Sequence, residues 1–275
     1  MAVLLALLSS VVWGGADFTG GLVSRRMPAI AVVAWSQTSG LVTIAAVAIA
    51  TGAYSAPVGW LGWSVLAGLS GGLGLICFYT ALSIGTMGVV SPIAALGAVV
   101  PVVAGLLGGD RPSRLQWAGM LLGLLGAVAA SGPELSGGAR LRSVWLAALA
   151  GLGFGIALYG IQRGARDSPM MTLVGMRAAS VGSFALAAAL SRTLIRVPAR
   201  YVRVVAAVGI GDVTANLAFG VASTVGMASI VAVLGSLYPV VTVLLGRLVL
   251  DERLALIQLL GVGLAMGGII LLAIG

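Results

Sequence analysis

The chain carries one stretch of sequence twice: GAVVPVVAGLLG at residues 97–108 and GSLYPVVTVLLG at residues 235–246. The glycine, proline, leucine-leucine and glycine positions of the two copies match at one constant offset, counted from Gly97 to Gly235. Both copies are almost wholly apolar, and each contains a proline, which interrupts the hydrogen bonding of a helix. A duplicated, apolar, glycine-rich sequence is typical of membrane proteins built from repeats, a group that includes secondary transporters.

The composition indicates that the solvent of this chain is lipid. Of its 275 residues 60% are hydrophobic and only 8% are charged, whereas about 25% of a soluble domain is charged. The net charge of +8 comes from arginines, most of which lie between or at the ends of the apolar segments, where they set membrane topology and contact lipid headgroups. Basic and aromatic residues are not interleaved, so we expect no nucleic-acid binding.

The sequence predicts an all-α integral membrane fold with ten membrane-spanning helices. Apolar segments of about 20 residues recur along the chain, and each can cross a hydrocarbon core of about 30 Å. Lipid offers the backbone no water, which favours helices, and no alternating pattern indicates a barrel. The expected spans are Val3–Leu22, Ala29–Ala50, Trp60–Leu82, Gly88–Leu107, Leu115–Ala130, Val144–Gly164, Pro169–Leu190, Tyr201–Ala222, Met227–Leu248 and Leu254–Ile274.

The expected spans fall into two equal halves. The one loop of polar character, Ser131–Ser143, lies at the middle of the chain, so five spans precede it and five follow. Because five is odd, two copies of a five-span unit must cross the membrane in opposite orientations, as inverted repeats. We therefore expect a first repeat over residues 1–132, a central loop over 133–143 and a second repeat over 144–275, with a cavity between the two repeats.

Further features resemble a known family. They are Trp13-Gly14 in the first span, Arg177 in the seventh, the run LGSLYP at residues 234–239, and Asp251-Glu252-Arg253 followed by Gln258 and Gly261. Together and in this order they resemble the drug/metabolite transporter (DMT) superfamily, and within it the EamA-type ten-helix permeases. The resemblance implies a basket of helices around a central cavity, alternating access and, usually, export (efflux) of small metabolites or amino acids.

Three charged residues lie within the expected spans and away from their ends, where a charge is costly and marks function by default: Asp17, Arg177 and Asp212. Arg177 and Asp212 lie on consecutive antiparallel helices, roughly 20 Å and roughly 17 Å from the same face. They form either a substrate site, with Arg177 holding a carboxylate and Asp212 an amine or a proton, or an ion pair that locks two helices. Asp17 either faces the cavity or lies at the membrane interface, where it would balance Arg25 and Arg26.

Uncharged polar residues extend this candidate site. Asn216 lies one helical turn after Asp212 and so shares its face. Tyr159 lies in the sixth span, which is the repeat partner of the first, and Tyr238 lies in the middle of the ninth span. We expect the substrate-binding cavity to be lined by Asp17, Tyr159, Arg177, Asp212, Asn216 and Tyr238.

Prolines interrupt the fourth and ninth spans at matching places. Pro101 and Pro239 are equivalent residues of the duplicated stretch, and Pro92 lies earlier in the fourth span. A proline frees a backbone carbonyl and can bend its helix. Paired interruptions in matching helices point to the binding site of a repeat transporter, so we expect all three prolines near the cavity.

The composition also argues against several chemistries. The chain has no histidine and one cysteine, Cys77, so it lacks the commonest metal ligand and the commonest general base. We expect no metal, no cofactor and no enzymatic activity, since an intramembrane enzyme needs a nucleophile with a base, or a metal cluster. A non-transporting membrane scaffold or accessory subunit is the alternative to a transporter.

The expected partners are the lipid bilayer and a small-molecule substrate, and the choice of protons as coupling ion is open. The patterns Gly119-x-x-x-Gly123 and Gly263-x-x-x-Gly267 favour close helix packing and leave monomer and homodimer open. We expect the plasma membrane of a prokaryote. The arginines are concentrated in the odd-numbered loops, which favours both termini outside, whereas the family resemblance implies both termini inside.

Overall fold

The structure is a computed structural model, and it describes the chain except for residues 86, 131–140, 191, 193–195 and 251–254. Every regular element of the described part is a helix. The α-helices are α1 Ala2–Ser24, α2 Ala29–Thr51, α3 Leu61–Ile84, α4 Met87–Ala95, α5 Val99–Leu107, α6 Arg114–Ala130, α7 Leu141–Gly164, α8 Pro169–Leu190, α9 Ala199–Val225, α10 Ala228–Gly235, α11 Tyr238–Leu250 and α12 Leu256–Ile274. The short 3-10 turns are η1 Ala53–Ser55, η2 Val58–Trp60 and η3 Leu96–Ala98.

Seven helices of the described part are long and apolar enough to cross a membrane, judged by length and composition. They are Ala2–Ser24, Ala29–Thr51, Val58–Ile84, Leu141–Gly164, Pro169–Leu190, Ala199–Val225 and Leu256–Ile274. The other three expected spans fall on the shorter apolar helices Ile93–Leu107, Arg114–Ala129 and Ala228–Thr242. Two of these contain a break, and α6 has 17 residues, which cover about 25 Å.

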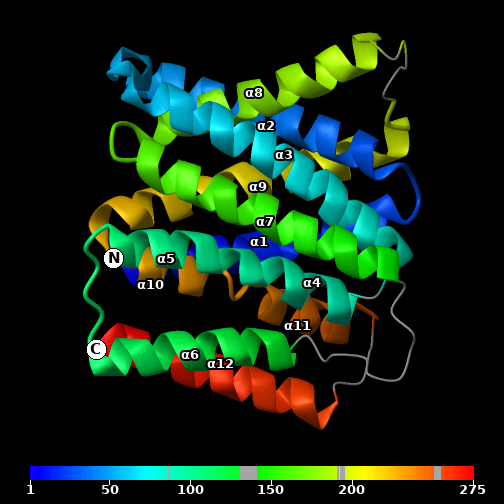
Figure 1. The fold of residues 1–275 in the computed structure, drawn as a ribbon. Helices are drawn as coiled ribbons and strands as arrows, with labels where there is room; N and C mark the ends of the chain where they lie inside the picture. Colours follow the sequence, from blue (N-terminus) through cyan, green and yellow to red (C-terminus); the bar gives the residue numbers. More distant parts are fainter. Residues whose placement is uncertain (86, 131–140, 191, 193–195, 251–254) are drawn as a thin grey trace.

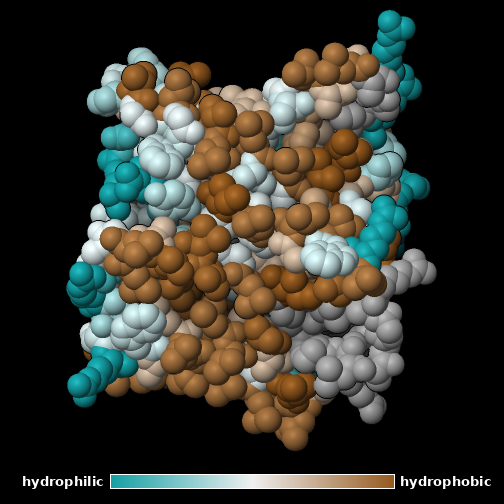
Figure 2. Space-filling view, in the orientation of Figure 1, coloured by the Kyte–Doolittle hydropathy of each residue, from teal (hydrophilic) through white to brown (hydrophobic). Residues whose placement is uncertain are grey.

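The surface has an apolar middle and polar ends. Figure 2 shows hydrophobic residues across the centre of this face and hydrophilic residues towards its left and right margins, and the helices in Figure 1 run between these margins. Large apolar side chains such as Leu73, Trp145 and Leu190 are more than half exposed. Soluble proteins rarely expose apolar area on this scale, so the chain is a multi-pass membrane protein.

The two halves of the chain pack with exchanged partners. Helix α3 of the first half packs against α7 of the second, and the corresponding helix α9 of the second half packs against α1 of the first. The shorter helices follow the same rule, because α4 and α5 pack on α7 whereas α10 and α11 pack on α1. Helix α2 packs on its own counterpart α8, and α6 on α12. Each half therefore completes the packing of the other.

Helices α6 and α12 form a close pair at one side of the bundle (Figure 1). A Cβ atom at Gly268 would lie 2.6 Å from the amide nitrogen of Gly123 and 2.8 Å from the carbonyl oxygen of Gly119. Gly263 and Gly267, in contrast, have no neighbouring atom within 4 Å of such a Cβ. Gly119 and Gly123 of α6 thus pack against Gly268 of α12. Gly263 and Gly267 do not take part in this contact.

Candidate functional site

Two helical segments are interrupted at matching places. Between α4 and α5 the chain forms the 3-10 turn η3, and between α10 and α11 it passes through Ser236 and Leu237. Pro101 and Pro239 follow these breaks, and neither can donate the hydrogen bond that would make the helix continuous. Pro92 lies within α4, before the first break; its side chain is outside the described part of the structure.

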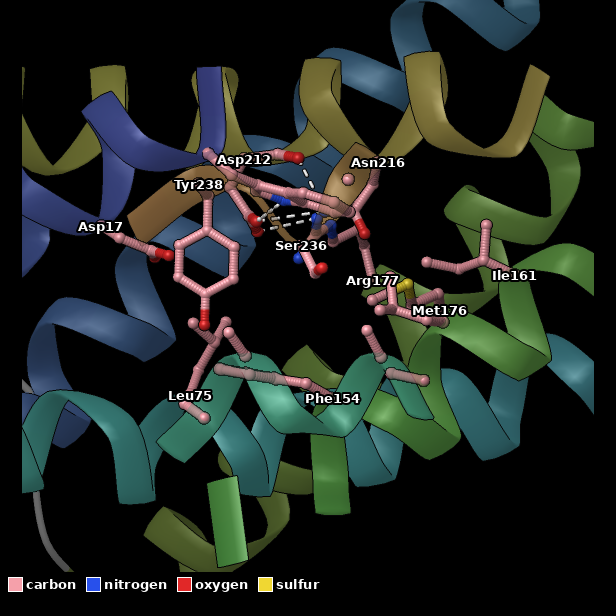
Figure 3. A pocket seen from close by; sticks show the side chains of 18 residues that line it. Asp17, Leu75, Phe154, Ile161, Met176, Arg177, Asp212, Asn216, Ser236 and Tyr238 are labelled. Atoms are coloured by element: carbon pink, nitrogen blue, oxygen red, sulfur yellow. Dashed lines mark hydrogen bonds and ion pairs between the residues drawn. The ribbon is translucent and has the colours of Figure 1, made fainter. Parts of the chain in front are cut away.

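A cavity lies between the two halves, next to both breaks. Ala98 from the first break lines it, as do Gly235 and Ser236 from the second. Its volume is about 70 Å³, which is room for several water molecules. Figure 3 shows polar side chains converging on this space from one direction and apolar side chains from the other.

Arg177 of α8 and Asp212 of α9 form an ion pair at the cavity, with 2.8 Å between Nη2 and Oδ2. The arginine side chain is 1% exposed and the aspartate side chain 14%. The pairing that their similar depth predicts is therefore confirmed. Loss of one partner of a buried pair leaves an uncompensated charge, which is strongly destabilising.

Three more donors reach the Asp212 carboxylate. The indole Nε1 of Trp13 donates to Oδ1 at 3.1 Å, and Nδ2 of Asn216 donates to the same oxygen at 3.0 Å. Nε2 of Gln37 donates to Oδ2 at 3.4 Å. Asn216 also donates to the backbone carbonyl of Asp212 at 2.7 Å, which follows from their spacing of one helical turn. The carboxylate is thus held by side chains from α1, α2 and α9 besides Arg177.

Gln37 of α2 connects this ion pair to a third helix. Nη1 of Arg177 donates a hydrogen bond to Oε1 of Gln37, and the Ser180 hydroxyl donates to the same oxygen at 3.0 Å. Nε and Nη2 of Arg177 have no hydrogen-bond partner in the described part of the structure, although Nη2 lies at ion-pair distance from Asp212. Asp212 therefore balances the positive charge of Arg177, and Nη1 is the nitrogen that donates a described hydrogen bond.

Asp17 of α1 lines the same cavity. The residue is 9% exposed, and the buried Tyr79 is one of its neighbours. No described arginine lies within ion-pair distance of its carboxylate. Of the two positions that the sequence allows, the structure shows the one at the cavity, and not the one that would balance Arg25 and Arg26 at the interface.

Tyr238 begins α11, directly after the second break. The residue is 8% exposed, and its ring packs edge-on against Phe78 with 6.4 Å between the centroids. Figure 3 shows the ring beside Asp17, with the hydroxyl pointing across the cavity towards Leu75. This hydroxyl has no hydrogen-bond partner among the described atoms. A buried polar group without a partner costs about 1–3 kcal/mol, so the position suits a ligand atom.

Tyr159 does not line this cavity. Its ring packs edge-on against Trp63 with 5.6 Å between the centroids, and the Arg163 guanidinium lies over the same Trp63 ring at 5.1 Å. Helix α7 turns Phe154 and Leu158 to the cavity, and a helix rotates by about 100° per residue, which carries Tyr159 to the neighbouring face. We expected Tyr159 at the cavity because it is polar, whereas the residues that α7 contributes to the cavity are apolar.

Equivalent positions of the two halves line opposite sides of the cavity. At the offset that separates Trp13 from Phe154, the further equivalent pairs are Asp17 with Leu158, Asp212 with Gly71, and Asn216 with Leu75. Every member of these pairs lines the cavity. Helices α1 and α9 therefore supply polar side chains at positions where α7 and α3 supply apolar ones. The same positions of both repeats therefore line one cavity. Their residues differ between the repeats, so that one wall of the cavity is polar and the opposite wall is apolar.

The chemistry of these walls suits reversible binding of a small amphipathic molecule. The described residues contain no group of three or more His, Cys, Asp or Glu side chains that could hold a metal ion. Among the described atoms, the polar wall instead offers an ion pair, a carboxylate without a cationic partner, and three buried polar atoms without a hydrogen-bond partner, which are the Tyr238 hydroxyl and Nε and Nη2 of Arg177. The apolar wall offers Leu75, Phe154 and Leu158.

Comparisons with known proteins agree with the duplicated fold. The sequence model of the EamA-like transporter family matches residues 1–132 and again residues 141–274. A solved structure described as "Crystal structure of protein" superposes with a TM-score of 0.77 at 22% sequence identity, covering 98% of this chain and 95% of that chain. At this identity the likeness shows the fold alone. The comparison with curated proteins gives no match.

Proposed function

Because this chain belongs to the EamA-like transporter family, we propose that it is a secondary transporter that exports a small metabolite, an amino acid or a similar molecule, by alternating access. The observation that carries the proposal is the cavity between the halves, which equivalent positions line twice and which adjoins both helix breaks. Export as the direction, and a prokaryotic plasma membrane as the location, rest on the family resemblance.

The proposed topology has ten spans in two inverted repeats of five. Helices α7 to α12 repeat the order of α1 to α6, with α4 and α5 taken as one broken span and α10 and α11 as another. The exchanged packing of the halves supports a pseudo-two-fold axis in the plane of the membrane. Such an axis brings the cavity near the midplane and makes the two routes of access equivalent.

The contacts between the halves support a change of access at one end of the molecule. Asp110, which follows α5, accepts a hydrogen bond from the Ser229 amide in the first turn of α10 at 2.8 Å. Met227, the N-cap residue of α10, makes no side-chain capping bond, so a residue of the other half caps this helix. In the proposed mechanism this contact opens when the cavity opens to that side, and the two breaks are the hinges.

Counterflow into proteoliposomes tests the proposal directly. The purified chain is reconstituted and offered a panel of radiolabelled amino acids, sugars and organic amines, with and without an imposed pH gradient, and empty vesicles are the control. We expect saturable uptake of one chemical class, which the unlabelled compound inside the vesicles accelerates. A folded protein that moves no member of the panel would contradict the transport proposal and favour a scaffold or accessory subunit.

A further inference from the structure

The charges that line the cavity do not balance. The Asp212 carboxylate lies 2.8 Å from the Arg177 guanidinium, so these two charges cancel. Asp17 lines the cavity as well, and no described cationic group lies within ion-pair distance of it. With both aspartates ionised, the described lining of the cavity therefore carries one net negative charge.

The Asp17 carboxylate is a costly group unless something neutralises it. The residue is about nine-tenths buried, and an ionised group in a membrane protein interior is stable when it is paired. Its described neighbour Tyr79 is an uncharged residue. Figure 3 shows the carboxylate at the edge of the cavity beside Tyr238. A cation bound in the cavity would neutralise it.

Tyr238 provides the second, independent observation. Its hydroxyl is buried and has no hydrogen-bond partner among the described atoms, and it lies at the same end of the cavity as Asp17 (Figure 3). An ammonium group carries three donors, so one group can bind the Asp17 carboxylate and the Tyr238 hydroxyl oxygen together. Such an ammonium group would neutralise the charge of Asp17 and would give the Tyr238 hydroxyl a hydrogen-bond partner.

From these observations we infer that the cavity binds a small organic cation, an alkyl- or arylammonium ion without a carboxylate. Its ammonium group lies between Asp17 and Tyr238, and its apolar body lies against Leu75, Phe154 and Leu158. The inference rests on the proposed function, since the cation is then the transported substrate, and among small metabolites it favours amines over the amino acids named there.

The same contacts disfavour an anionic ligand. Arg177 is the cationic residue among the described cavity-lining side chains. It is 1% exposed, it forms an ion pair with Asp212, and its Nη1 donates a hydrogen bond to Gln37. A ligand carboxylate would have to break this pair and would also meet the negative charge of Asp17. We therefore expect the cavity to reject acids of the size that it accepts as amines.

Equilibrium binding to the full chain in lipid nanodiscs tests the inference with three probes of nearly equal size. The probes are 2-phenylethylamine, 2-phenylethanol and phenylacetate, measured by isothermal titration calorimetry at neutral pH. The ammonium group carries a charge that pairs with Asp17, whereas the hydroxyl group does not, so the amine is expected to bind at least about tenfold more tightly than the alcohol. Equal affinities, tighter binding of phenylacetate, or no binding of the amine at millimolar concentration would each overturn the inference.

Matched variants assign the preference to a residue. Asp17→Asn keeps the shape of the side chain and removes its charge, so the ratio of amine to alcohol affinity is expected to fall to about one. Asp167→Asn removes a carboxylate from an exposed position outside the cavity and should leave the ratio unchanged. Tyr238→Phe should weaken the amine by about tenfold or more, because the hydrogen bond from the charged ammonium group to the hydroxyl oxygen is lost. An unchanged ratio of amine to alcohol affinity in Asp17→Asn contradicts the inference. If Asp17→Asn does not fold, binding of the three probes to the unaltered chain decides whether the cavity prefers a cation.

Uptake separates this inference from the proposed function. Binding that prefers the amine, without uptake of labelled 2-phenylethylamine into proteoliposomes, supports the cation site and contradicts transport. Saturable uptake of a neutral or anionic solute by a chain that shows no preference for the amine supports transport and overturns the cation site.

Discussion

Asp17 in α1 and Leu158 in α7 occupy equivalent positions of the two halves, and both line the same cavity. One position of the ancestral unit thus carries a carboxylate in one copy and an isobutyl group in the other. The scaffold has two equivalent halves, but the cavity has a charged side and an apolar side. A ligand bound there has one preferred orientation, with its polar group towards α1 and α11.

The Arg177–Asp212 pair predicts an order of stabilities. Asp212→Asn leaves the arginine, which is 1% exposed, without its counter-charge, and we expect a loss of about 3–5 kcal/mol. Arg177→Met leaves a carboxylate that is 14% exposed and keeps three neutral donors, so its loss is smaller. The double variant is expected to be more stable than Asp212→Asn alone. Unfolding in detergent measures this order, and a double variant as unstable as the sum of the single variants would contradict the pairing.

Two adjacent glycines of α1 predict opposite effects of one substitution. At Gly14 a Cβ atom would lie 2.5 Å from the Val241 Cβ atom and 2.8 Å from the Tyr238 carbonyl oxygen. We therefore expect Gly14→Ala to cost about 1–3 kcal/mol through overpacking. At Gly15 a Cβ atom meets nothing within 4 Å, and Gly15→Ala should stabilise the helix by about 0.5–1 kcal/mol. Thermal unfolding of the two variants compares them, and equal effects would argue against this packing of α1 on α11.

The contact between Asp110 and α10 predicts a local change in dynamics. Asp110→Ala removes the acceptor of the Ser229 amide, which lies 2.8 Å away, and the loss of a cap costs about 1 kcal/mol. Hydrogen exchange should therefore become faster at the first turn of α10 and stay unchanged in α7. The exposed residue Asp167 provides the matched control, Asp167→Ala, for which exchange at α10 is expected to stay at its original rate.

The second helix break predicts a variant that folds but transports slowly. Pro239→Ala supplies the N–H that can bond to the Gly235 carbonyl and so favours a continuous helix. If the break is a hinge of the transport cycle, initial uptake should fall by about tenfold or more while the protein stays folded. Pro198→Ala, at the N-cap of α9, is the control and should transport normally. Normal uptake by Pro239→Ala would contradict the proposal that the second helix break is a hinge of the transport cycle.

Part of the site could be predicted because helical geometry alone determines it. The spacing of residues from the ends of two consecutive spans gives the depth of Arg177 and Asp212, and the four-residue spacing gives the shared face of Asp212 and Asn216. The duplicated prolines similarly locate both helix breaks, since a proline disrupts the turn that precedes it. These inferences need no knowledge of how the helices pack against one another.

The apolar wall and the place of Tyr159 could not be predicted in this way. Helix α7 is apolar on most of its faces, so periodicity does not show which face turns inward. Packing decides it: a Cβ atom at Gly97 would overlap the Gly151 backbone, and one at Gly155 would overlap the Gly97 carbonyl. This close approach to η3 turns Leu158 to the cavity and Tyr159 towards Trp63. In the sequence, Leu158 looks like any lipid-facing leucine.

Accessibility of a single cysteine from both sides of the membrane tests the central claim most directly, because it requires no knowledge of the substrate. Cys77, the one native cysteine, is first replaced by alanine. Ala95→Cys then places a thiol at a buried position of the cavity wall. Leu73→Cys is the control, because Leu73 is 63% exposed on the apolar exterior and a charged reagent does not reach lipid-facing thiols.

The measurement is labelling of each variant in sealed, oriented vesicles by a charged methanethiosulfonate reagent, added from one side at a time. Alternating access through this cavity predicts that Ala95→Cys is labelled from either side and that Leu73→Cys is labelled from neither. Labelling of Ala95→Cys from one side alone, or from neither, would contradict a cavity that opens in turn to the two sides of the membrane.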